Sequence, residues 1–136
     1  MKWFVCVALA LFLASCSPAF VSKFNFDFPL KSDEVWKVVF NASKEIAFDF
    51  SLAGTPHLDK TNWVYATFKT TAPALAGSGV VPSDRKNLVM VFQISSTEQL
   101  SCVVPLTDQT LTNKGIGAQY QNDRKTASFG CAISKK

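Results

Sequence analysis

Apolar and polar residues alternate along several stretches of this chain, and this alternation constrains the fold more than any other sequence feature. A period of two places apolar side chains on one face of an extended strand and polar side chains on the other. It occurs in residues 23–28, 48–52, 100–106, 116–120 and 127–133. Two further stretches, residues 63–69 and 88–94, are rich in the aromatic and β-branched residues that favour strands. The pattern predicts a mostly antiparallel sheet of six or seven strands.

A single helix is predicted from residue 32 to residue 45. Ser32 is a suitable N-cap, and the acidic residues that follow it favour the positive end of a helix dipole. Apolar residues then recur at the spacing of an amphipathic helix, at Val35, Val38, Val39, Ala42 and Ile46. The expected fold class is therefore α+β, with one helix packed on the sheet.

Polar and glycine-rich segments separate the predicted strands. Residues 95–98 and 121–124 are expected to be turns, and the second turn is expected to join the strands of a terminal hairpin. Residues 70–85 contain several Gly and Pro residues and form the longest break in periodicity. This range is expected to be a long loop, which is either a simple connection or an element that docks a partner.

The first fifteen residues have the pattern of an export signal. Lys2 is followed by an uncharged apolar run over residues 3–14. A membrane-spanning helix needs about 20 apolar residues, so this run is too short to span a bilayer. The predicted organisation is a signal peptide at 1–15, a short tether at 16–22 and a single α+β domain at 23–136.

The end of this run, Leu13-Ala14-Ser15-Cys16, resembles the lipobox of bacterial lipoproteins. In that family the cysteine thiol receives a diacylglycerol and the signal is cut just before it, so the resemblance implies lipidation at Cys16. Ser17 is similar to the residue that directs Gram-negative lipoproteins to the outer membrane. The resemblance therefore implies a lipid-anchored protein of the cell envelope, on the outer membrane and facing the periplasm. The alternative is a plain signal peptide and a free secreted domain.

Two shorter resemblances bear on function. Residues 29–67 contain a Ser-Asp-Glu-Val-Trp helix start, a strand and a Trp-containing strand. This layout is similar to the helix-containing lobes of the outer-membrane-assembly lipoprotein C family, which implies a scaffold or binding role. Residues 115–120, Gly-Ile-Gly-Ala-Gln-Tyr, are similar to the binding-loop pattern of periplasmic lysozyme-inhibitor lipoproteins but lack its Ser and Arg. An inhibitor of this kind is the first alternative function.

Two cysteines of the predicted domain are expected to lie in the core. Cys102 alternates with Leu100 and Val104, and Cys131 alternates with Phe129 and Ile133. In an oxidising compartment two such cysteines are expected to form one disulfide. The alternative is a pair of unbonded thiols in the core.

Support for catalysis in the sequence is slight. His57 is the only histidine, and Asp59 lies near it, so a small secreted hydrolase is the second alternative function. The Gly-x-Ser-x-Gly nucleophile motif and a Gly-rich phosphate loop are both lacking. The net charge is only +4 and the basic residues are scattered, which makes nucleic acid a poor partner. We therefore predict no catalytic residue, metal or cofactor, and a binding or scaffold module with a protein partner in the envelope.

Overall fold

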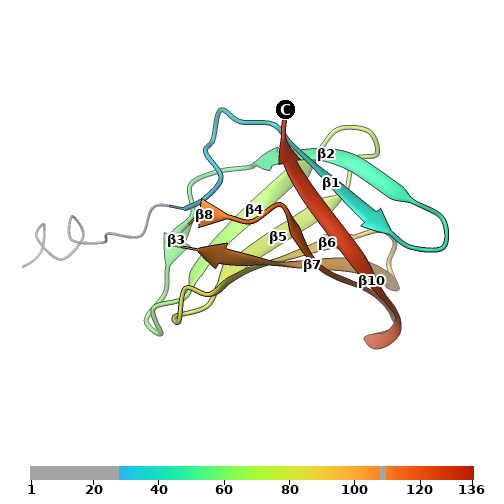
Figure 1. Cartoon of the computed structure of the whole chain (residues 1–136). Coiled ribbons are helices and arrows are strands. Elements are labelled where there is room, and N and C mark those ends of the chain that lie inside the picture. Colours follow the sequence, from blue (N-terminus) through green and yellow to red (C-terminus); the bar gives the residue numbers. More distant parts are fainter. Residues whose placement is uncertain (1–27, 108–109) are drawn as a thin grey trace, which may run out of the picture.

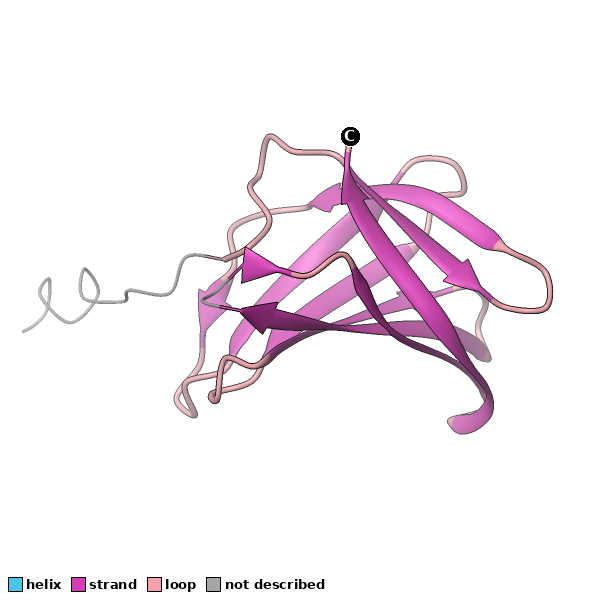
Figure 2. Ribbon diagram, viewed as in Figure 1, coloured by secondary structure: helices cyan, strands magenta, loops and turns pink. Residues whose placement is uncertain are grey.

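In residues 28–107 and 110–136, which the computed structural model describes, all regular structure is β and every strand pairing is antiparallel (Figures 1 and 2). The strands of this part of the chain are β1 (Trp36–Asn41), β2 (Ile46–Leu52), β3 (His57–Leu58), β4 (Val64–Thr70), β5 (Ala76–Val81), β6 (Asn87–Gln93), β7 (Glu98–Thr107), β8 (Thr110–Leu111), β9 (Lys114–Gln121) and β10 (Arg124–Lys135).

The described strands form a closed eight-stranded barrel. They are hydrogen-bonded in the order β2-β1-β10-β9-β7-β6-β5-β4, and β2 pairs with β4 to close the ring. The short strand β3 also pairs with β4, and β8 pairs with β7. Closure matters because an open sheet edge presents unpaired backbone groups that promote aggregation.

The predicted α+β fold is wrong, because residues 32–45 form no helix. Strand β1 occupies Trp36–Asn41, and β2 begins at Ile46 after a bend. The valines of this segment are β-branched, which restricts them in a helix and favours them in strands. Val38 and Phe40 also fit a period of two, and both are buried. Pairing of β1 with β10 on one side and β2 on the other decides between the two periodicities.

Most of the other predicted strands are confirmed. Residues 48–52, 63–69, 88–94 and 100–106 match β2, β4, β6 and β7 closely, and β9 and β10 form the terminal hairpin. Asn122 and Asp123 at its turn both have positive φ, as a two-residue type I′ hairpin turn requires. The strand predicted at 23–28 lies outside the described residues except for Phe28, which is buried in the core.

Phenylalanine rings fill the inside of the barrel. The ring of Phe92 lies at the centre of this cluster, with centroid distances of 4.9 Å to Phe48 and 5.5 Å to Phe50. Both pairs have the edge-to-face geometry that aromatic rings prefer. Phe40 and Phe68 are also buried and contact the same ring. An eight-stranded barrel is just wide enough for side chains to fill its interior, and here rings do so.

Inward-facing glycines provide the space for these rings. A Cβ atom at Gly79 would lie 2.6 Å from Cζ of Phe68, and one at Gly77 would lie 2.9 Å from Cδ1 of Phe92. Both glycines belong to β5, so the predicted loop at 70–85 is wrong over Ala76–Val81. The prediction fails because rings from β4 and β6 occupy the positions where β5 would otherwise place apolar side chains.

The predicted disulfide between Cys102 and Cys131 is confirmed. Their Cα atoms lie 6.0 Å apart, within the usual range for a disulfide. The bond joins β7 to β10 across the intervening strand β9, whose Gly117 pairs with Cys102. A Cβ atom at Gly117 would lie 3.4 Å from Cβ of Cys131. The two cysteines are 29 residues apart in the sequence. Closing a loop of this length adds about 3.5 kcal/mol to the free energy of unfolding in the chain-entropy model.

We predict that Gly79→Ala lowers the free energy of unfolding by about 1–3 kcal/mol, because the new methyl group overpacks the site against the buried Phe68 ring. Gly130→Ala is the matched control, since the nearest atom to its new Cβ is 3.7 Å away. The control is expected to be neutral or slightly stabilising, because alanine suits a strand interior better than glycine. Urea unfolding measures both variants. Equal stability of the two would contradict the packing of rings against β5.

Candidate binding surface

An irregularity between β2 and β3 produces a hollow on the outer side of the barrel. Leu52 pairs with Phe68 and His57 pairs with Tyr65. The chain therefore advances five residues from β2 to β3 while the paired strand β4 advances only three. The two additional residues bow the chain away from β4. Gly54, with φ of 149°, lies in this segment and supplies a backbone conformation that other residues rarely adopt.

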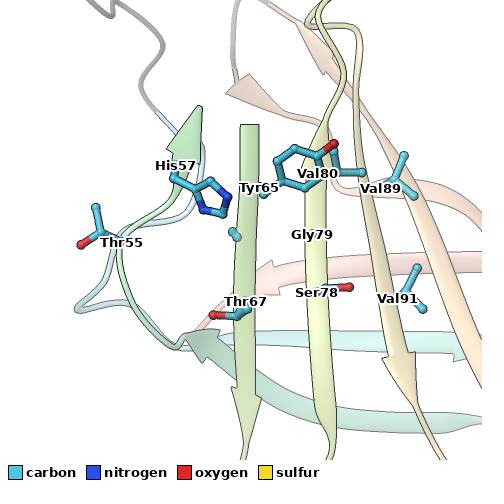
Figure 3. Close-up of a pocket in the computed structure, with 10 residues that line it drawn as sticks. Thr55, His57, Tyr65, Thr67, Ser78, Gly79, Val80, Val89 and Val91 are labelled. Carbon is cyan, nitrogen blue, oxygen red and sulfur yellow. The ribbon is translucent and has the colours of Figure 1, made fainter. Parts of the chain in front are cut away.

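The hollow has a volume of about 460 Å³ and extends from β3 across β4 and β5 to β6 (Figure 3). This volume lies within the range of pockets that bind ligands or side chains. His57 of β3 lies at one side and Val89 and Val91 of β6 at the other, with Tyr65 and Thr67 of β4 and Ser78 of β5 between them. The lining contains no Asp, Glu, Lys or Arg and consists of Thr55, His57, Tyr65, Ala66, Thr67, Ser78, Gly79, Val80, Val89 and Val91.

Two stacked rings form one wall of the hollow. The centroids of His57 and Tyr65 are 5.6 Å apart and the planes are tilted by only 24°. Removal from water and the nearby Asp59 carboxylate raise the pKa of the Tyr65 hydroxyl above its usual value of 10.0. The phenol therefore stays neutral at physiological pH.

Asp59 shapes the loop that carries this wall. Its Oδ1 accepts hydrogen bonds from the hydroxyl of Thr61 at 2.7 Å and from the backbone N–H groups of Thr61 and Trp63 at 2.9 Å. The bond from the Thr61 hydroxyl is the main cause that lowers the pKa of the Asp59 carboxyl below 3.8. Arg85 fastens the same loop to the β5–β6 loop by donating to the carbonyl and side-chain oxygens of Asn62 at 2.7 and 3.1 Å.

An unbroken row of apolar side chains crosses the outer wall of the barrel, and its first three members also line the hollow. Consecutive register partners are Tyr65, Val80, Val89, Val103 and Ile116, one from each of β4, β5, β6, β7 and β9. We call these five residues the apolar row. Ile116 is 70% exposed, far more than is usual for a large aliphatic side chain, and the other four are half-buried.

On one side, the apolar row is flanked by mostly small and uncharged residues. The next register line consists of Thr67, Ser78, Val91, Ser101 and Ala118. Among the residues of β4, β5, β6, β7 and β9, all of which are described, only Lys69, Glu98 and Lys114 are charged. The carboxylate of Glu98 accepts a hydrogen bond from Gln119 at 2.7 Å. The outer wall is therefore apolar along its centre, with its cationic groups at the margins.

The structure does not bring the candidate residues of the sequence analysis together in one site. Cys16 lies outside the described residues. His57 lines the hollow, but one oxygen of Asp59 is taken up by the loop that it stabilises. Residues 115–120 form part of strand β9 and not a loop. Gly117 in this range is explained by packing against Phe129, because a Cβ atom there would lie only 2.8 Å from Cδ2 of that ring.

Sequence reasoning misses the apolar row. Its members come from five strands and meet only through the register of four pairings, so no local pattern reveals them. The alternation at residues 116–120 instead places Ile116 on the apolar face of the predicted strand, whereas in the structure Ile116 faces outward and is 70% exposed.

Comparison with protein-family models, curated proteins and solved structures finds no match for the chain. In residues 28–107 and 110–136, no helix is long and apolar enough to cross a membrane. The same residues hold no group of three or more His, Cys, Asp or Glu side chains placed to bind a metal ion.

We predict that Asp59→Ala moves the ionisation of Tyr65 back toward pH 10, because the nearby negative charge and its hydrogen bond are lost. The ultraviolet absorbance of tyrosinate measures this, in a Tyr120→Phe background so that only Tyr65 is observed. Asp123→Asn, in the β9–β10 turn, is the control and should leave the midpoint unchanged. An Asp59→Ala midpoint equal to that of the parent would contradict the coupling.

The lowered pKa of Asp59 has a consequence for stability in acid. The ionised Asp59 carboxylate adds to the free energy of unfolding. This stabilisation is fully present above the unfolded-state pKa of 3.8 and is lost as pH falls through the lower folded-state pKa. The raised pKa of Tyr65 acts in the opposite direction, since its contribution is present below 10.0 and is lost as pH rises through the folded-state value.

Proposed function

We propose that this protein is a lipid-anchored binding module of the cell envelope, held on the periplasmic face of the outer membrane through Cys16, and that a partner protein docks on the outer wall of its barrel. The observation that supports docking is the apolar row with Ile116 70% exposed. Apolar side chains gathered on an exposed surface are typical of interaction sites.

The packed interior favours this function over storage of a small molecule inside the barrel. The large rings and aliphatic side chains inside are almost completely buried and contact one another. The hollow and the apolar row are both on the outside. Binding is therefore expected on the outer wall and not in the lumen.

The proposed anchor leaves this wall accessible. Phe28 is twelve residues after Cys16, so the domain would stay within about 40 Å of the lipid attachment point. The described chain enters at the end of the barrel where β1 begins, together with the β3–β4 and β5–β6 loops (Figure 1). The apolar row runs around the side of the barrel, where a second protein in the periplasm can reach it.

We predict that Cys16→Ser transfers the protein from the membrane fraction to the soluble fraction, because a chain without acyl groups has no anchor. Cys6→Ser is the matched control, since Cys6 lies in the segment that is expected to be removed. Cell fractionation and mass spectrometry of the native protein measure the outcome. An unmodified Cys16 thiol, or equal fractionation of the two variants, would overturn the lipid anchor.

We predict that a photo-crosslinking amino acid at position 116 forms a discrete covalent adduct with one envelope protein in living cells. Position 35 is the control, because Val35 is also an exposed β-branched residue, at 46%, but precedes β1 and lies off the outer wall. Immunoblotting compares the two. The same pattern of adducts from both positions would argue against docking on the wall.

A further inference from the structure

We infer that the outer wall binds one extended, mainly apolar segment of a partner protein, with a bulky apolar side chain in the hollow and a carboxylate beside Lys114. This inference rests on the proposed binding function and specifies the chemistry of the partner. It follows from three features of the described residues: the path of the apolar row, the lining of the hollow, and the position of the charges.

The path of the row favours an extended segment. The row spans four strand spacings of about 4.8 Å, or about 19 Å in total. It runs from β4 to β9, which are four steps apart in the ring of eight strands. The row therefore passes halfway around the barrel and follows a strongly convex surface. A straight helix would touch only the middle of such a curve. An extended segment of about six residues, at about 3.3 Å per residue, covers the distance and can bend with it.

The hollow determines what lies at the β4 end of the segment. Its walls are the Tyr65 and His57 rings and the valines of β5 and β6, and its lining contains no Asp, Glu, Lys or Arg. Burying a charged side chain there without a partner would be costly, whereas an aliphatic or aromatic side chain gains by leaving water. The hydroxyls of Thr67 and Ser78 make no hydrogen bond within the described residues and lie in the hollow, where they can bind the backbone of the segment.

The positions of charged side chains determine which end of the bound segment carries a carboxylate. Lys114 is exposed and lies two positions before Ile116 on the same face of β9, about 7 Å away along the strand. It has no ion-pair partner among the described residues. At the β4 end, the Asp59 carboxylate lies close to Tyr65, whereas the cationic Lys69 is four positions away along β4, at about 13 Å. A carboxylate on the segment is therefore favoured at the β9 end and disfavoured at the β4 end.

The test is a selection from a displayed library of random dodecapeptides against the full mature chain carrying Cys16→Ser, which keeps it free of lipid. The expected result is enrichment of peptides with an apolar centre and an Asp or Glu near one end only. Ile116→Ser should weaken the selected peptides at least tenfold, whereas Val35→Ser should not. Lys114→Glu should weaken them and favour peptides with a basic end, while Lys37→Glu on β1 should leave binding unchanged.

Amide chemical shifts of the labelled protein locate the bound peptide. Changes confined to β4, β5, β6, β7 and β9 are expected, with the peptide itself extended. Selected peptides that bind Ile116→Ser equally well, that bind as helices, or that show no preference for an acidic end would overturn the inference. A dimer of the chain that disappears in Ile116→Ser would also overturn the inference. Adsorption of the chain to neutral or anionic vesicles that disappears in the same variant would do so as well. These outcomes are independent of lipidation, so failure here leaves the result for Cys16 intact.

Discussion

The contact between phenylalanine rings and inward-facing glycines is the interaction on which the rest of this structure depends. Each glycine removes a side chain from one strand so that a ring from a neighbouring strand can occupy the space, as Phe68 does over Gly79 and Phe92 does over Gly77. This exchange fills a narrow barrel with few, large groups at close packing. The same arrangement recurs on β9, where Gly117 leaves room for Phe129 and for the disulfide that crosses the strand.

The strands are largely predictable from sequence, because alternation is a local property of the chain. The helix prediction at 32–45 is wrong because the valines there satisfy two periods, and pairing of β1 with β2 and with β10, nearly a hundred residues later, decides between them. Strand β5 escapes prediction for a related reason, since its core is supplied by rings from other strands. The pairing of Cys102 with Cys131 is predictable because each lies in a clearly alternating strand.

The candidate site is far less predictable than the strands. The sequence analysis names His57 as the residue that a small hydrolase would use. In the structure His57 stacks on Tyr65 and lines a hollow. The apolar row exists only after five strands have taken their register, and the hollow is lined in part by Thr55, from the segment between β2 and β3 that holds two additional residues. Long-range register therefore creates the surface to which we assign binding, and no single segment encodes it.

A closed barrel with a solid core separates stability from binding. The buried rings and the disulfide hold the ring of strands together, so outward-facing residues such as Ile116 are free to serve recognition without weakening the fold. An exposed isoleucine adds little to stability, and we propose that a partner protein covers it together with the rest of the apolar row. The proposed lipid at Cys16 would then confine that partner to the membrane surface.

A nuclear Overhauser spectrum of the mature chain tests the barrel and its outer wall most directly, because it detects the ring–glycine contacts themselves. Strong cross-peaks are expected from the Phe68 ring to the α-protons of Gly79 and from the Phe92 ring to those of Gly77. Cross-strand peaks are also expected between β1 and β10. Absence of the ring–glycine peaks, together with helical sequential peaks over residues 32–45, would contradict the barrel and the outer wall built on it.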